Sequence, residues 1–170
     1  EKHAKRFGYS FEHLGMVGFS AGCCLANLYI QGGDCLFNRL DYPTTVFQPA
    51  ALVGFYGPYD FASRQAERKS SDAELNRQHS PSYWIRQEPG RKRPPVLHIQ
   101  GDLDETVFPD QHQRFQRDCA ELEFPFQAIT AAGFGHRFAP RDTNAMGEQI
   151  DLGPDMVNFL QQHVGPGRAP

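Results

Sequence analysis

The chain has 170 residues, of which 39% are hydrophobic and 22% charged, and its formal net charge is −3. A chain of this length and composition can bury a core as one domain, so disorder is not expected. Basic residues are concentrated only at Arg91-Lys92-Arg93, which argues against nucleic acid as a partner, because phosphate binding needs a basic face. No apolar run is long enough for a transmembrane segment.

Hydrophobic spacing predicts strands that alternate with helices, which is typical of an α/β fold with a mainly parallel sheet. Functional sites of such sheets collect beyond the carboxyl ends of the strands, so the loops after the strands are the places to search. A polar helix tail over 1–7 ends at Gly8. The expected strands cover 14–19, 50–56, 96–99 and 126–130, and the further helices cover 21–31, 110–122 and 156–164.

The helix over 21–31 is expected to carry its apolar residues at Cys24, Leu25, Leu28 and Tyr29 and to stop at Gly32-Gly33. The segment 58–94 is polar and irregular apart from a helix near 70–78, and we interpret it as a cap-like insertion outside the core. Its aromatic side chains fit either a wall over the site or ordinary packing; they are Tyr59, Phe61, Tyr83 and Trp84.

The cysteines lack the spacing of a zinc site. Cys23 and Cys24 are adjacent in a predicted helix, so we expect thiols rather than disulfides, which favours a reducing compartment such as the cytoplasm. Any targeting signal would lie upstream of Glu1, and these patterns do not determine the oligomeric state. The other two thiols are Cys35 and Cys119.

The stretch 18–22, GFSAG, fits the pattern G-x-S-x-G between a predicted strand and a predicted helix. In a nucleophile elbow the turn is crowded, so a Cβ at either Gly18 or Gly22 would clash with a neighbouring element. The turn lifts the Ser20 hydroxyl above the sheet, and the backbone N–H of Ala21 points to where an oxyanion would form. Ser20 is the predicted nucleophile, and the alternative is a small-residue turn that contains a serine by chance.

A serine hydroxyl needs a base, and the base needs an orienting carboxylate. The strand over 96–99 runs into a loop with three candidates, Asp102, Asp104 and Glu105. Asp102 directly follows the turn glycine, where a carboxylate typically caps the turn, so Asp104 is favoured. Each of the three could instead be a solvated turn carboxylate.

Among seven histidines, His136 alone follows the last core strand within a flexible loop, between Gly133-Phe134-Gly135 and Arg137. His98 falls inside a strand and suits a core role, whereas His112 and His163 are expected on exposed helix faces. His136 is therefore the predicted base. The order Ser20, Asp104, His136 is the chain order of α/β-hydrolases and differs from either main serine-protease order.

With these residues, the chain resembles the esterase/lipase branch of the α/β-hydrolase superfamily, and it is most similar to BD-FAE-like and related carboxylesterases. The resemblance runs from about residue 11 to 163 and is carried by GMVGFSAG, SPSYWI, RPPVLHIQGDLDETVFPDQHQRF and GFGHRF. The family pattern places the acid three residues after the strand-ending glycine, which implies Asp104 again. This chain departs from the family pattern at Cys23-Cys24, where a small glycine is common.

The resemblance also implies about four strands before the elbow strand and a His-Gly-Gly loop among them that donates a second oxyanion N–H. Nothing before Gly15 matches these features. The chain is therefore expected to be a single partial α/β-hydrolase domain, 1–170, that holds the C-terminal half with the triad. The strand over 14–19 would then have an unpaired edge.

Two other chemistries fit parts of the same loop. Residues 102–106, DLDET, match the DxDx[TV] pattern of haloacid-dehalogenase-type phosphatases, but that chemistry needs a later lysine and the last one is Lys92. Clustered carboxylates suggest calcium, but Val107 stands where an EF-hand loop has glycine. No metal and no cofactor are therefore expected.

The sequence thus predicts a serine hydrolase that cleaves carboxylic esters of small molecules through an acyl-enzyme. Ser20 attacks, His136 takes and returns the proton, and Asp104 orients the imidazole. A prolyl-oligopeptidase-type serine peptidase shares this fold and order, so ester and amide cleavage both stay open. A hydrolase-derived domain that binds a partner without turnover is the non-enzymatic alternative.

Overall fold

A computed structural model describes residues 4–8, 13–39, 48–61 and 73–164. Its centre is a four-stranded sheet of order β1-β2-β3-β4 in which every neighbouring pair is parallel. This confirms the predicted mainly parallel sheet with flanking helices. The strands are β1 (Gly15–Phe19), β2 (Ala51–Phe55), β3 (Val96–Gly101) and β4 (Phe126–Ala131).

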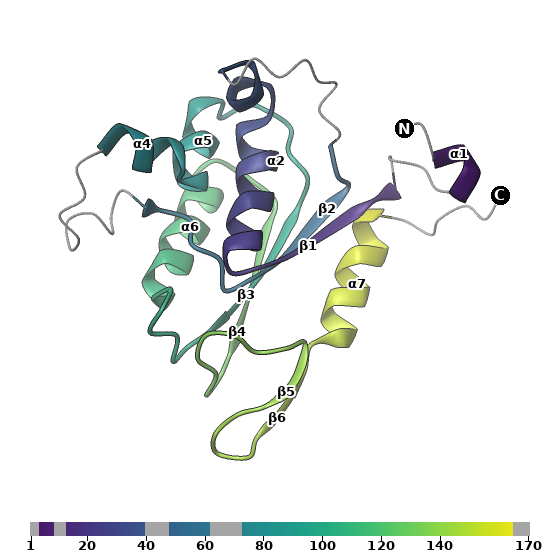
Figure 1. The fold of residues 1–170 in the computed structure, drawn as a ribbon, viewed down its shortest axis with the longest axis vertical. Coiled ribbons are helices and arrows are strands. Elements are labelled where there is room, and N and C mark those ends of the chain that lie inside the picture. The colour runs from purple at the N-terminus through teal and green to yellow at the C-terminus, as the bar shows by residue number, and fades with distance from the viewer. Residues whose placement is uncertain (1–3, 9–12, 40–47, 62–72, 165–170) are drawn as a thin grey trace.

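Helices cover both faces of the sheet (Figure 1). Successive strand residues point to opposite faces, so Val53 and Phe55 pack with Phe159 on one face, whereas Leu52 packs with Phe115 on the other. Burial on both faces explains why the two central strands, β2 and β3, are fully buried. One face carries α2 (Ala21–Arg39), α5 (Pro81–Gln87) and α6 (Pro109–Glu121), and the other carries α7 (Gly153–Val164).

Helix α2 differs from its prediction in register and length. Cys24 is buried as expected, but Leu25 was wrongly placed on this face, because it is 66% exposed. The other buried side chains of the helix include Cys23, Ala26, Asn27 and Ile30. The predicted stop is a kink, since Gly33 has φ +43° and the helix continues to Arg39. The Arg91 guanidinium occupies the space that a Cβ at Gly33 would need, which explains the glycine there.

The segment between β2 and β3 contributes to the core, so the expectation that it lies outside was wrong. Trp84 and Ile85 of α5 are buried against α2, and Tyr59 is buried and stacked on Phe115 at 4.0 Å. For Tyr59, ordinary packing is therefore the correct alternative. The sequence of this segment has only short apolar clusters separated by polar residues. It therefore shows no continuous hydrophobic periodicity from which its burial could be predicted. Helix α4 (Ala73–Gln78) matches part of the expected helix, whose residues 70–72 lie outside the described chain.

The remaining elements follow their predictions with small differences. Helix α1 (Ala4–Phe7) ends at Gly8, which has φ +69°. A hairpin of three-residue strands, β5 (Arg141–Thr143) and β6 (Gln149–Asp151), was not predicted, because such short polar strands carry no alternation. The apolar face of α7 packs on the core as expected. None of the described helices is long and apolar enough to cross a membrane.

Candidate active site

Ser20 lies in the turn between the end of β1 at Phe19 and the start of α2 at Ala21. Its φ is +50°, a left-handed conformation that a residue with a Cβ rarely adopts. Two hydrogen bonds hold it there: the Ser20 N–H donates to the Phe55 carbonyl at 2.9 Å, and the Cys24 N–H donates to the Ser20 carbonyl at 3.1 Å. The backbone is therefore fixed in a strained turn, and the hydroxyl stays partly accessible.

The two glycines that flank this turn have different roles. A Cβ at Gly18 would lie 2.8 Å from the backbone N and Cα of Cys23, so only glycine fits. A Cβ at Gly22 would meet nothing within 4 Å, so the expectation of crowding there was wrong, because Gly22 lies on an exposed helix face. Cys23 fits behind the serine because its sulfur lies over Gly54, where a Cβ would lie 2.5 Å from it.

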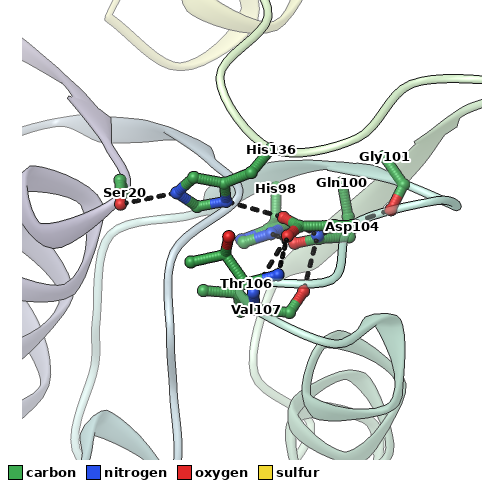
Figure 2. A network of polar contacts seen from close by, with 8 residues as sticks. All are labelled: Ser20, His98, Gln100, Gly101, Asp104, Thr106, Val107 and His136. Carbon is green, nitrogen blue, oxygen red and sulfur yellow. Dashed lines mark hydrogen bonds and ion pairs between the residues drawn. The ribbon is translucent and has the colours of Figure 1, made fainter.

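His136 lies in the loop after β4, and its Nε2 is 2.9 Å from Ser20 Oγ (Figure 2). The loop is held by Asp102, whose Oδ1 accepts the Gly133 N–H at 2.7 Å, and Gly133 has φ +75°. The Tyr56 ring meets the imidazole edge-on, with ring centres 4.7 Å apart. Asp102 was expected to cap its own turn, but its side chain instead holds the loop that carries His136.

Asp104 is buried, and its carboxylate accepts four hydrogen bonds. Its Oδ2 accepts from His136 Nδ1–H at 2.8 Å and from Gln100 Nε2–H at 2.8 Å. Its Oδ1 accepts the backbone N–H groups of Thr106 and Val107 at 2.8 and 2.9 Å. A buried carboxylate needs such partners, because unpaired burial of a charge is costly. Glu105, the third candidate, is exposed.

The structure thus brings Ser20, His136 and Asp104 together from three loops at one edge of the sheet, as Figure 2 shows. Ala21 is the first residue of α2, and the first N–H groups of a helix have no acceptor within the helix. Its N–H is therefore the donor nearest in sequence to the Ser20 hydroxyl that could stabilise an oxyanion.

The other described histidines have different environments. His98 is fully buried, as expected for a core residue, whereas His112 was wrongly expected on an exposed face. His112 is 5% exposed and packs against His98 with ring centres 4.5 Å apart and the rings tilted by 40°, because α6 turns this side toward β3. Burial lowers the pKa of His112 to about 4 and lowers that of His98 well below its usual 6.5. His13, His79 and His163 are exposed.

Two residues at this site were missed by the sequence interpretation. Gln100 is the penultimate residue of β3 and contacts Asp104, and Tyr56 follows β2 with φ +38° and contacts His136. A polar glutamine at the end of an apolar strand, just before the loop of the predicted acid, was the available signal for Gln100. Tyr56 carried no signal, because a tyrosine after an apolar strand is common.

The described thiols are unpaired and buried. Burial raises the pKa of Cys23 and of Cys24 to about 12 and raises that of Cys119 as well, so all three stay protonated. The Cys35 side chain lies outside the described residues. No group of three or more potential metal-ligating side chains lies together in the part of the chain that the structure describes.

Solved structures with the same fold include hydrolases from several bacteria. A carboxylesterase from Lactobacillus plantarum matches with a TM-score of 0.68 and 17% identity, over 95% of this chain and 62% of that one. Thermogutta terrifontis esterase 2, phosphoramylated by tabun, matches with 0.65 and 20%, over 95% and 56%. A Mycobacterium tuberculosis puromycin-hydrolyzing peptidase matches with 0.64 and 22%, over 96% and 24%.

The chain therefore has the α/β-hydrolase fold and spans less than two thirds of the length of these proteins. No curated protein sequence matches it significantly. The BD-FAE family model matches residues 1–118, which include Ser20 and Asp104 but end before His136. Since this match covers more than half of the 170 residues, the chain belongs to the BD-FAE family, an esterase-type group of α/β-hydrolases.

Proposed function

We propose that this chain hydrolyses carboxylic esters of small molecules, with Ser20 as nucleophile, His136 as general base and acid, and Asp104 as the group that orients His136. The observation that carries the proposal is the continuous contact from Ser20 Oγ to His136 Nε2 at 2.9 Å and from His136 Nδ1 to the buried Asp104 at 2.8 Å. Such an arrangement activates a weak hydroxyl nucleophile.

The chemistry follows from these positions. Ser20 Oγ attacks the ester carbonyl while His136 Nε2 takes the hydroxyl proton, and Asp104 stabilises the imidazolium that forms. The Ala21 N–H donates to the oxyanion of the tetrahedral intermediate. His136 then protonates the leaving alcohol, and the acyl-Ser20 ester forms. Water, activated by the same imidazole, hydrolyses that ester and restores Ser20.

Covalent labelling tests the nucleophile directly. A fluorophosphonate is expected to add one phosphonyl group to the protein, seen by intact-mass spectrometry, and to leave Ser20→Ala and His136→Ala unlabelled. His163→Ala is the matched control, because His163 is an exposed histidine on α7, and it should label like the wild type. The choice of probe is supported by the structural neighbour from Thermogutta terrifontis, which carries an organophosphorus adduct. Equal labelling of Ser20→Ala, or none of the folded protein, would refute the assignment.

Peptide cleavage is the second candidate, because one structural neighbour is a puromycin-hydrolyzing peptidase. Ester and amide substrates with the same acyl group separate the two proposals. With p-nitrophenyl esters and the matching p-nitroanilides, ester hydrolysis predicts turnover of the ester alone. Turnover of both that is lost in Ser20→Ala would favour the peptidase, and labelling without turnover of either would favour a binding domain.

A further inference from the structure

The Asp104 carboxylate is held from the core side by a buried glutamine at the end of β3. Gln100 is 1% exposed, and its Nε2 lies 2.8 Å from Asp104 Oδ2 and 3.1 Å from the Val107 carbonyl (Figure 2). Both contacts are hydrogen-bond acceptors, so the NH₂ end of the amide must face them. The chemistry of the neighbours therefore fixes the orientation of the Gln100 amide.

The other end of this amide faces His98. Gln100 Oε1 is 3.3 Å from His98 Nε2, and because an amide oxygen only accepts, His98 carries its proton on Nε2. His98 is fully buried, and burial together with the neighbouring His112 holds its pKa well below 6.5, so the ring is neutral. Its Nδ1 is then an acceptor, and the Tyr59 hydroxyl, which contacts it, is the donor.

With these assignments, the hydrogen bonds form a series in which the donor and the acceptor of each bond are fixed. Tyr59 donates to His98, His98 donates to Gln100, and Gln100 donates to Asp104. This series of hydrogen bonds starts in the core, where Tyr59 is fully buried, and ends at the Asp104 oxygen that accepts the His136 Nδ1–H. One group cannot turn without leaving another buried donor or acceptor unpaired, which makes such a network rigid.

We propose that Gln100 is a positioning residue for the hydrolytic site, and that His98 and Tyr59 fix the amide that orients the Asp104 carboxylate. The two backbone N–H groups hold only Oδ1 of Asp104, so among the described residues Oδ2 is held by Gln100 and His136. This inference rests on the proposed function, because it adds a part to the same site.

Steady-state kinetics with p-nitrophenyl acetate test the role of the amide. Gln100→Met keeps the side-chain length and removes both hydrogen-bonding ends, so kcat should fall about tenfold while KM changes less than about twofold. Gln31→Met is the matched control. Gln31 is 1% exposed on α2, and among the described residues its side-chain amide has no hydrogen-bond partner. Equal kcat values for the two variants would overturn the proposal.

A double-mutant cycle separates positioning from a general loss of packing. Tyr59→Phe removes one hydroxyl and should lower kcat about threefold, since a neutral hydrogen bond is lost at a distance from the site. If Tyr59 acts through Gln100, adding Tyr59→Phe to Gln100→Met should lower kcat no further. Additive effects in the double variant would mean that the two residues act independently, which contradicts the series of hydrogen bonds.

A spectroscopic readout that needs no turnover distinguishes this inference from the proposed function. The His136 Nδ1–H should give a downfield proton resonance, identified by its loss in His136→Ala and its persistence in Ser20→Ala. Gln100→Met should shift it or broaden it by exchange with water, and Gln31→Met should leave it unchanged. An unchanged resonance in Gln100→Met overturns the positioning role even if esterase activity is found, whereas a shifted one supports it even if the wild type hydrolyses no ester.

Discussion

His136 and His98 belong to one hydrogen-bonded network, but their surroundings differ. His136 is partly buried between the Ser20 hydroxyl and the Asp104 carboxylate. His98 is fully buried between a phenol and an amide, both neutral, and packs against the ring of His112. The Asp104 carboxylate orients the imidazole of His136, whereas burial lowers the pKa of His98 well below 6.5 and keeps that ring neutral. The neighbours, not the residue type, decide which histidine can serve as a base.

The two aspartates of the loop after β3 show the same contrast. Asp104 is buried and accepts four hydrogen bonds, one of them from His136. Asp102 is exposed and accepts the Gly133 N–H, which shapes the loop that carries His136. One aspartate is thus placed to act on the imidazole, and the other on the loop backbone.

The largest effect is expected for Asp104→Asn. The new NH₂ group would face two donors, His136 Nδ1–H and Gln100 Nε2–H, so the imidazole would be held in the wrong tautomer. Ester hydrolysis should fall about a thousandfold to ten-thousandfold in kcat. Asp102→Asn keeps the oxygen that accepts from Gly133 and should stay within about threefold of wild type, since it preserves that hydrogen bond. Equal losses would break the contrast between the two aspartates.

Replacing His98 should mainly lower stability, whereas replacing His136 should mainly lower ester hydrolysis. His98→Leu leaves the Tyr59 hydroxyl without its acceptor and Gln100 Oε1 without its donor, so unfolding free energy should fall by about 2–4 kcal/mol. His136→Ala should abolish ester hydrolysis but lower stability by about 1 kcal/mol or less, because it faces solvent in part. Denaturant unfolding measures both. A similar loss of stability in both variants would contradict the comparison.

The strained turn that carries Ser20 can be tested at Gly18 and Gly22, the two glycines that flank it. Gly18→Ala places a Cβ 2.8 Å from the Cys23 backbone and should destabilise the protein by about 1–3 kcal/mol while slowing fluorophosphonate labelling. Gly22→Ala meets no neighbour and should stabilise α2 by up to about 1 kcal/mol with unchanged labelling. Thermal unfolding and labelling rates compare the pair, and equal destabilisation would show that the crowding is not specific to Gly18.

The burial of His112, which packs against His98, should make the unfolding free energy depend on pH. The pKa of His112 is lowered to about 4 in the folded protein, so between about 6.5 and 4 the unfolded chain binds more protons. Unfolding free energy should therefore fall as the pH falls through this window, by up to about 1.4 kcal/mol per pH unit for each such histidine. His112→Leu should reduce this dependence of the unfolding free energy on pH by up to about 1.4 kcal/mol per pH unit. The same slope in both proteins would mean that His112 is accessible to protonation.

The order of the four sheet strands and of the helices other than α5 could be predicted from the sequence, and so could the loops that carry Ser20, Asp104 and His136. Those features depend on local chemistry, because apolar periodicity marks strands and helices and glycines mark turns. Asp104 was favoured over Asp102 from its place in the loop, and the structure puts only Asp104 against His136. Which of these residues are catalytic stays a prediction until the variants are measured.

Tertiary structure alone decided which polar groups are buried and what they contact. The burial of His112, the core role of Ile85 and the contact of Gln100 with Asp104 all depend on surfaces brought together from distant parts of the chain. Sequence periodicity reports one element at a time, whereas a buried polar group is stable only where partners from other elements complete its hydrogen bonds. The sequence therefore determined which loops carry Ser20, Asp104 and His136, and packing decided which groups hold these side chains in place.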